Sequence, residues 1–208
     1  MQLRFQTGLT GEEYVSRKAW CLATLAYCPE HGPDGGCDFA GHGSYERVSP
    51  PGTRIARWYC PQAHCSYSLL PDHLAARFPG TLPDIEHVVA TAEEARSLEA
   101  AANELRRDDI TLPSAMRWVR RRLDPVRDSL TIMVGLIPQM LLGCAPTLNS
   151  LRARLGCEQV LMLLRALAEV HLQALARPLG FRPPPYARGR RKSRLQQTMG
   201  PAPPPQAA

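Results

Sequence analysis

The chain of 208 residues is 44% hydrophobic and 21% charged, which is typical of a folded, soluble protein and argues against a largely disordered one. The first 30 residues contain no secretory signal pattern, and the longest apolar run, residues 130–145, is too short to span a membrane. Seven cysteines without such a signal indicate a reducing compartment, so we expect a cytoplasmic protein with no membrane partner.

The net charge of +6 conceals a strong asymmetry along the chain. Residues 1–105 contain 8 basic and 13 acidic residues, whereas residues 106–208 contain 17 basic and 6 acidic residues. Such a concentration of positive charge is expected of a surface that contacts phosphates. A solubilising surface in an arginine-rich chain would give the same count, and that alternative stays open.

The N-terminal third contains a lead-in followed by a cysteine-rich module. Residues 1–27 have a mixed pattern that fits either a short helix or no regular element. Residues 28–65 are rich in glycine, proline and cysteine, and within them two β-prone runs flank a Pro-Pro-Gly turn signal in "YERVSPPGTRIARWYC". This pattern predicts a β-hairpin between two cysteine corners, inside a small module at residues 28–80.

The two corners bring four thiols into one short segment. A structural zinc ion takes four Cys or His donors, usually from two turns that meet across a hairpin. We therefore predict zinc as cofactor, with four cysteine ligands: Cys28, Cys37, Cys60 and Cys65. His31, which follows Cys28 at the compact spacing of a knuckle turn, and His64 are alternative donors. Packing of buried cysteines without a metal is the competing interpretation.

From residue 81 onward, the apolar residues recur three or four positions apart, which is the period of a helix. Thr-Leu-Pro occurs at residues 81–83 and again at 111–113, and each time Thr can cap a helix whose first turn accepts the proline. The second of these helices should end near Asp124, because Pro125 follows it. We expect three further parts: a helix-turn-helix-like segment at residues 81–128, a helical bundle at 129–181, and a disordered Pro/Arg-rich tail at 182–208.

The helix that starts after Thr111 has the length and charge of a DNA-recognition helix. Four of its residues are predicted to contact nucleic acid: Ser114, Arg117, Arg120 and Arg121. The tail is predicted to add five more: Arg188, Arg190, Arg191, Lys192 and Arg194. A solvated arginine face without a ligand is the alternative for the helix.

The segments "HGSYERV", "IARWYC" and "SYSLLPDHLAARFPGTLPDIEHVV" resemble the zinc-ribbon heads of bacterial insertion-sequence transposases and their stand-alone relatives. In that family, two cysteine knuckles and a Ser-Leu-Leu-Pro exit lead into a helix-turn-helix that binds DNA. Cys28 and Cys60 match the first cysteine of each knuckle directly. His31 and Ala63 stand where the second cysteines would be, so the resemblance assigns the fourth ligand to His64 or Cys65.

The resemblance implies a zinc-ribbon module and a DNA-binding function without the catalytic domain, because residues 81–180 show only helical patterns. Four acidic residues are interpreted as helix caps or solvated side chains and not as catalytic groups: Asp84, Glu86, Asp108 and Asp109. The expected fold class is mainly α with a small β-hairpin zinc-ribbon module and a disordered basic C-terminal tail.

The function that we expect is non-enzymatic DNA binding, as a mobile-element accessory protein or a transcriptional regulator. The expected partners are double-stranded DNA and other mobile-element proteins, with no small-molecule substrate. A protein-binding or RNA-binding adaptor is the alternative, for which a ribbon and a basic tail would also serve.

Overall fold

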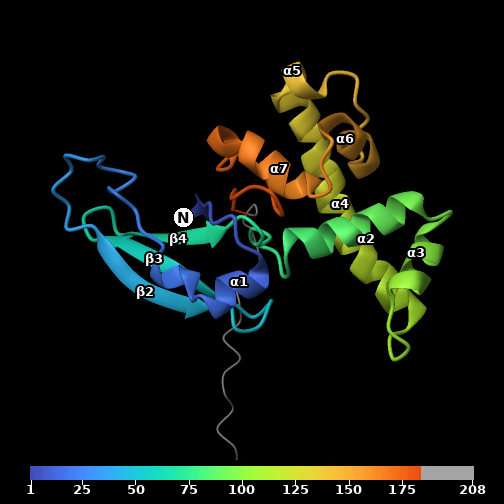
Figure 1. Cartoon of the computed structure of the whole chain (residues 1–208), viewed down its shortest axis with the longest axis horizontal. Helices are drawn as coiled ribbons and strands as arrows, with labels where there is room; N and C mark the ends of the chain where they lie inside the picture. Colours follow the sequence, from blue (N-terminus) through green and yellow to red (C-terminus); the bar gives the residue numbers. More distant parts are fainter. Residues whose placement is uncertain (184–208) are drawn as a thin grey trace, which may run out of the picture.

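The computed structural model describes residues 1–183 and contains a β-sheet at one end and a group of helices at the other (Figure 1). The sheet has four strands in the order β1-β4-β3-β2. The bounds of the strands are β1 Gln2–Phe5, β2 Ala40–Glu46, β3 Arg54–Cys60 and β4 Cys65–Pro71. The mixed helical and β composition agrees with the predicted fold class, but the sheet is larger than a hairpin.

The predicted hairpin is confirmed as β2 and β3, which pair antiparallel from Ala40 opposite Tyr59 to Glu46 opposite Arg54. Gly52 in the connecting turn has φ +74°, a conformation that glycine adopts without steric cost. The additional strand β1 comes from the lead-in and pairs parallel to β4, with Leu3 opposite Leu69. This pairing joins residues far apart in the sequence, so local periodicity does not reveal it.

The lead-in continues into helix α1, Gly11–Ser16, which lies beside the sheet (Figure 1). Thr10 and Glu13 form a capping box that satisfies the first backbone N–H groups of this helix. Tyr14 is fully buried, and its hydroxyl donates to the backbone carbonyl of Arg54 on β3 at 2.9 Å. A 3₁₀ turn follows at Ala19–Cys21.

The helical part contains six α-helices and a 3₁₀ turn among the described residues. Their bounds are α2 Leu82–Glu94, α3 Leu98–Leu105, α4 Leu112–Leu136, α5 Pro138–Leu141, α6 Leu148–Leu155, α7 Val160–Leu167 and the turn Glu169–His171. Both predicted Thr-Leu-Pro helix starts are confirmed in position, at α2 and α4; the side chain of Thr81 caps α2, whereas that of Thr111 makes no cap hydrogen bond. Within residues 1–183, no helix combines the length and the apolar composition needed to cross a membrane.

The prediction that the second helix ends near Asp124 is wrong, because α4 continues through Pro125 to Leu136. The proline removes the bond to the carbonyl of Arg121, which costs about 3 kcal/mol in a helix interior. Arg121 is exposed, so water can reach the carbonyl that this leaves free. Each large apolar side chain buried beyond the proline contributes about 1.5–3 kcal/mol, which outweighs the cost. The buried side chains on this part of α4 include Val126, Leu130 and Met133.

The two halves of α4 belong to different cores. Its first half packs with α2 and α3 around a small cluster of buried side chains: Val88, Ala102, Ala115 and Val119. Its second half enters the main core, which also contains Ile55 and Leu70 of the sheet. The expected boundary between residues 128 and 129 therefore lies inside one continuous helix, and the sheet and the helices share one core.

Arg165 on α7 connects the segment that follows β4 to the helical part through hydrogen bonds. Its guanidinium is completely buried and donates to four backbone carbonyls, those of Asp72, Leu74, Pro178 and Leu179. Burial lowers its pKa to about 9. The four carbonyl acceptors satisfy a charge that would be costly if it were buried unpaired.

Candidate metal centre and basic groove

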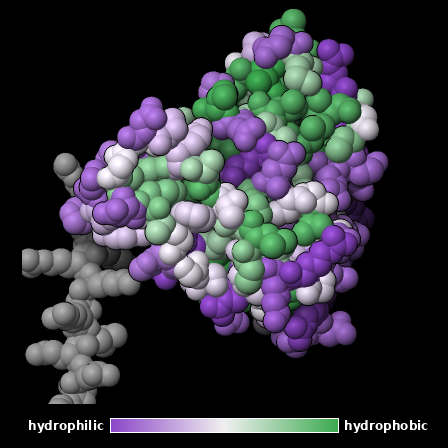
Figure 2. Space-filling view, turned by 60° about the vertical axis from the view of Figure 1, so that its left-hand side comes forward, coloured by the Kyte–Doolittle hydropathy of each residue, from purple (hydrophilic) through white to green (hydrophobic). Residues whose placement is uncertain are grey.

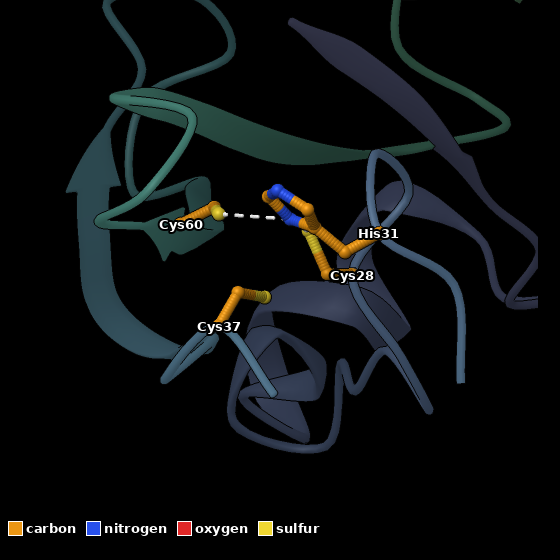
Figure 3. Close-up of side chains that lie close together, drawn as sticks. All are labelled: Cys28, His31, Cys37 and Cys60. Carbon is orange, nitrogen blue, oxygen red and sulfur yellow. Dashed lines mark hydrogen bonds between the residues drawn. The ribbon is translucent and has the colours of Figure 1, made fainter. Parts of the chain in front are cut away.

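Four side chains from the cysteine-rich module converge on one point: Cys28, His31, Cys37 and Cys60 (Figure 3). Their donor atoms all lie within 4.8 Å of one another. The three cysteines are buried, and His31 is exposed. They come from two turns and the loop between them, so folding is required to bring them together.

The first corner is the turn Cys28-Pro-Glu-His31, closed by a hydrogen bond from the N–H of Gly32 to the carbonyl of Cys28 at 2.8 Å. Gly32 has φ +71°, which suits glycine at this position. Because the turn is compact, one corner supplies two donors. The spacing alone indicated His31 as a candidate, and the geometry places it in the group of four.

The second corner follows the end of β3 and supplies one donor. The N–H of Ala63 points at the sulfur of Cys60 at 3.4 Å, which would stabilise a thiolate there. This turn again begins with Cys-Pro, but alanine occupies its fourth position. It therefore contributes Cys60 and leaves one further donor to come from elsewhere.

Cys37 supplies that donor from the loop that follows the first corner. The loop folds tightly over His31 at Gly35, where a Cβ atom would collide with the Cβ and the carbonyl of His31. Gly36 follows with φ +51°. Two adjacent glycines therefore let the chain turn closely enough for Cys37 to reach the other three side chains.

The distances within the group match those of a zinc site. With Zn–S bonds of about 2.3 Å and a Zn–N bond of about 2.0 Å, a tetrahedron places sulfur and nitrogen about 3.5 Å apart. The Nδ1 atom of His31 lies 3.4 Å from the sulfur of Cys28 and 3.5 Å from that of Cys60. The four residues thus lie close enough to hold a metal ion, and Cys₃His is a usual donor set for structural zinc.

The electrostatics of the thiols differ between Cys28 and Cys37. Burial opposes ionisation of Cys28, but hydrogen bonds from the backbone N–H groups of Glu30 and His31 help to lower its pKa to about 6. Burial, together with the neighbouring Cys28 and Cys60, raises the pKa of Cys37 to about 11. A bound cation would stabilise all of the thiolates at once, which is the usual coupling of metal binding to deprotonation.

An aromatic cluster supports the centre from the sheet side. Tyr67 is fully buried against the three cysteines, and its hydroxyl donates to the carboxylate of Glu30 at 3.2 Å. Phe39 stacks on Trp58 with ring centroids 5.2 Å apart and meets Tyr67 edge-on. These contacts fix the positions of both corners relative to the strands.

The remaining predicted donors lie outside the group of four. Cys65 pairs with Cys60 in the register of β3 and β4, and it packs beside the cluster without joining it. His64 has its Nδ1 atom 3.5 Å from the hydroxyl of Tyr59. Three of the four predicted cysteines therefore come together, and the alternative donor His31 takes the place that we had given to Cys65.

The predicted nucleic-acid contacts on α4 are divided between two hollows in the surface. Ser114, Arg117 and Arg121 line a groove of about 580 Å³, which lies against the turn between α3 and α4. Arg120 lines a smaller hollow between α4 and the residues that join α2 to α3, beside Asp124 and Arg127. The predicted tail residues Arg188 to Arg194 lie outside the described residues.

The groove also contains residues that the sequence did not single out. These are Leu105, Arg106, Arg107, Ile110, Ala115 and Trp118. Trp118 follows Ser114 by four positions, so helical periodicity could have placed it on the same face. Arg106 and Arg107 come from the turn, and only the packing of α3 against α4 brings them to this groove.

The surface differs between the two ends of the helical part (Figures 1 and 2). Hydrophobic residues gather at the end where α5 lies, and two large exposed side chains there are Met140 and Leu142. Hydrophilic residues predominate at the opposite end, where α3 and the first turns of α4 lie. The arginine groove therefore belongs to the hydrophilic end.

The acidic residues that we had interpreted as caps or solvated groups have distinct positions. Asp84 completes the capping box of α2 with Thr81, as expected. Glu86 is also a cap, as expected, but its carboxylate is buried and accepts hydrogen bonds from the backbone N–H groups of Val160 and Leu161. It caps the start of another helix, α7, instead of facing solvent.

Comparison with known proteins identifies no relative: no protein-family model, no curated protein and no solved structure matches the chain.

Proposed function

We propose that the chain is a non-catalytic DNA-binding protein, in which a zinc ion stabilises the sheet module and α4 presents the contacts to double-stranded DNA. The observation that carries this proposal is the basic groove. Four arginines line it, and no acidic residue does: Arg106, Arg107, Arg117 and Arg121. A groove of this composition suits phosphate groups.

The arrangement of α2, α3 and α4 supports the same function. These helices share a small apolar core, and six residues separate the end of α3 from the start of α4. In helix-turn-helix proteins, the N-terminal residues of the second helix of the motif contact the DNA. Arg117 and Arg121 lie in the first three turns of α4, and neither forms an ion pair with another residue in the range 1–183.

The role that we propose for zinc is structural. Four protein donors would fill a tetrahedral ion completely, whereas a catalytic zinc ion keeps one position for water or substrate. The sheet module is too small to have a large core of its own, so metal ligation would contribute to its folding. The three thiols must stay reduced to bind metal, which fits the cytoplasmic location expected from the sequence.

The experiment that tests DNA binding compares three variants with the parent protein on a short labelled DNA duplex, by fluorescence anisotropy at several salt concentrations. Arg117→Ala/Arg121→Ala should weaken binding and reduce the salt slope by about 1.8, if each arginine contacts one phosphate. Arg17→Ala/Arg96→Ala, which removes two exposed arginines elsewhere, is the matched control. Arg120→Ala reports separately on the smaller hollow.

Equal losses in the groove variant and the matched control would mean that only net charge matters, and would overturn the assignment of the groove. An unchanged affinity in the groove variant would also overturn it. Preference for structured RNA over the duplex would move the proposal to the RNA-binding alternative.

A protein partner, tested first as a second copy of this chain, is the second candidate. The observation that favours it is the group of exposed apolar side chains around the end of α4 and α5: Ile132, Met140 and Leu142, which are 39%, 38% and 80% exposed. A Leu142→Ser/Met140→Ser variant that keeps DNA binding but loses self-association in analytical ultracentrifugation would support a protein-binding role for this end.

A further inference from the structure

Trp118 ends an alternating ladder of arginine and aromatic side chains. The guanidinium of Arg122 lies 3.9 Å from the centroid of the Trp118 ring and 5.8 Å from that of Phe78. The guanidinium of Arg177 also lies near Phe78, 5.5 Å from its ring centroid. Cation–π contacts are modestly favourable at exposed sites, so the contact with Arg122 favours this position of the indole before any ligand binds.

The two middle members of the ladder, Arg122 and Phe78, each make a further contact with the rest of the protein. Arg122 also donates to the backbone carbonyl of Trp118 at 3.2 Å. Phe78 belongs to the loop after β4 and is packed against the main core. The Trp118 ring therefore lies against a guanidinium that is itself bonded to the backbone of the same helix, and 39% of the residue remains exposed.

The exposed part of the indole belongs to the basic groove. Arg122 covers one face of the ring, and the ring also lines the groove between α4 and the preceding turn. The apolar lining continues with Leu105, Ile110 and Ala115. A flat apolar surface therefore lies among the four arginines.

We infer that this groove binds an unpaired nucleotide of single-stranded DNA, with the base stacked on Trp118 and the adjoining phosphates held by Arg117 and Arg121. The inference rests on the proposed DNA-binding function and revises it for this groove, in which Arg117 and Arg121 would hold the phosphates of an unpaired strand in preference to those of a duplex. A volume of about 580 Å³ is in the range of sites that enclose small ligands.

The chemistry favours an unpaired base over a paired one. In a duplex, the faces of the bases are stacked on their neighbours, and a side chain in a groove reaches only the base edges. An indole presents a face and no hydrogen-bond acceptor, so it gains most from a base whose own face is free. The arginines that line the groove with Trp118 add the attraction for the phosphates that a purely apolar site would lack.

The hydrogen bond between Arg117 and Ser114 orders the rim of the groove. One guanidinium nitrogen of Arg117 lies 3.0 Å from the Ser114 hydroxyl, which in turn lies 3.0 Å from that of Thr111. Arg117 is thereby directed along the first turns of α4. The phosphate position that we infer lies between this side chain and Arg121, one turn later.

The test measures binding of the full-length, zinc-loaded protein to oligo(dT), to a blunt duplex of equal phosphate number, and to inorganic polyphosphate. Oligo(dT) should quench tryptophan fluorescence and bind more tightly than the duplex. Trp118→Ala should weaken oligo(dT) binding roughly 5- to 150-fold, the effect of losing one stacked base, and leave polyphosphate binding unchanged. Trp118→Phe should keep most of the affinity while losing most of the quenching.

The matched control is Trp20→Phe, because Trp20 packs against Tyr14 and does not line the groove. This substitution should leave the affinity and most of the quenching intact. Equal weakening of oligo(dT) and polyphosphate by Trp118→Ala would overturn the stacking role, as would an unchanged oligo(dT) affinity. Tighter binding of oligo(rU) than of oligo(dT) would overturn the choice of DNA. If the parent protein bound no nucleic acid at all, the proposed function itself would fail. If it bound the duplex but oligo(dT) no more tightly, only the present inference would be overturned.

Discussion

Glu86 on α2 and Val160 at the start of α7 are joined by a buried hydrogen bond, in which the backbone N–H of Val160 donates to the carboxylate at 3.0 Å. The second carboxylate oxygen accepts from the N–H of Leu161 at 2.9 Å, and Arg152 donates to the first at 3.2 Å. The N-cap residue of α7, Gln159, makes no side-chain cap bond. An acidic side chain from another helix therefore performs the capping of α7.

Replacing this carboxylate should destabilise the protein. Glu86→Ala would leave two buried N–H groups without acceptors, and we expect the free energy of unfolding to fall by about 2–4 kcal/mol. The measurement is urea denaturation followed by circular dichroism. Glu93→Ala is the matched comparison, because Glu93 caps α6 through Leu148 and Asn149 at a more exposed position. Its effect should be smaller, and a larger effect would contradict the assignment of Glu86 as the main inter-helix cap.

The purified protein should contain about one zinc ion per chain, because four donors fill one tetrahedral site. Elemental analysis gives the stoichiometry, and a chelator should lower the melting temperature. Cys60→Ser should lose most of the zinc, whereas Cys65→Ser should retain it, since Cys65 lies outside the group of four. Equal zinc loss in both variants would return Cys65 to the ligand set. A metal-free protein whose melting temperature does not respond to chelator would exclude the site altogether.

Acidification should destabilise the fold through His73. Burial, together with the nearby charges of Arg47 and Arg165, lowers the pKa of this imidazole to about 4, although Asp72 opposes the shift. Both ring nitrogens are buried without a partner in the described structure. The unfolded chain, with a pKa near 6.5, binds the proton first, so stability should fall as the pH decreases from about 6.5 to 4.

The measurement is the free energy of unfolding against pH for the parent and for His73→Leu. The difference between their slopes should reach at most about 1.4 kcal/mol per pH unit, corresponding to one proton. Comparing slopes removes the contribution of acid-induced metal loss, which both proteins share. Parallel curves would show that His73 is accessible to protons in the folded protein.

Deletion of residues 182–208 should weaken DNA binding without changing which sequence is preferred. The deletion removes six basic residues and no acidic one, and takes the net charge from +6 to 0. The salt slope should decrease by up to roughly 5, at about 0.9 per phosphate contact. Any sequence preference should persist, because phosphate contacts carry no sequence information directly. Random-duplex binding as tight as that of the parent would show that the tail takes no part.

Several features follow from the sequence because they depend on neighbouring residues. The Thr-Leu-Pro helix starts depend on a proline in the first turn and, at α2, on a side-chain cap from Thr81, and α2 and α4 begin where they predict. The Pro-Pro-Gly hairpin and the first Cys-Pro corner are equally local. At that corner, Cys28 and His31 are three residues apart, so their approach depends on one turn.

Other features were decided by contacts between distant segments. The spacing Cys60-x4-Cys65 favoured both cysteines as ligands, but a tight approach of Gly35 to His31 brings Cys37 to the site, and His31 completes it. Pro125 is a local signal to end a helix, and burial of the apolar residues beyond it outweighs that signal. Local propensities amount to a few kcal/mol at most, whereas a shared core adds many such contributions, so where the two disagree the tertiary structure determines the outcome.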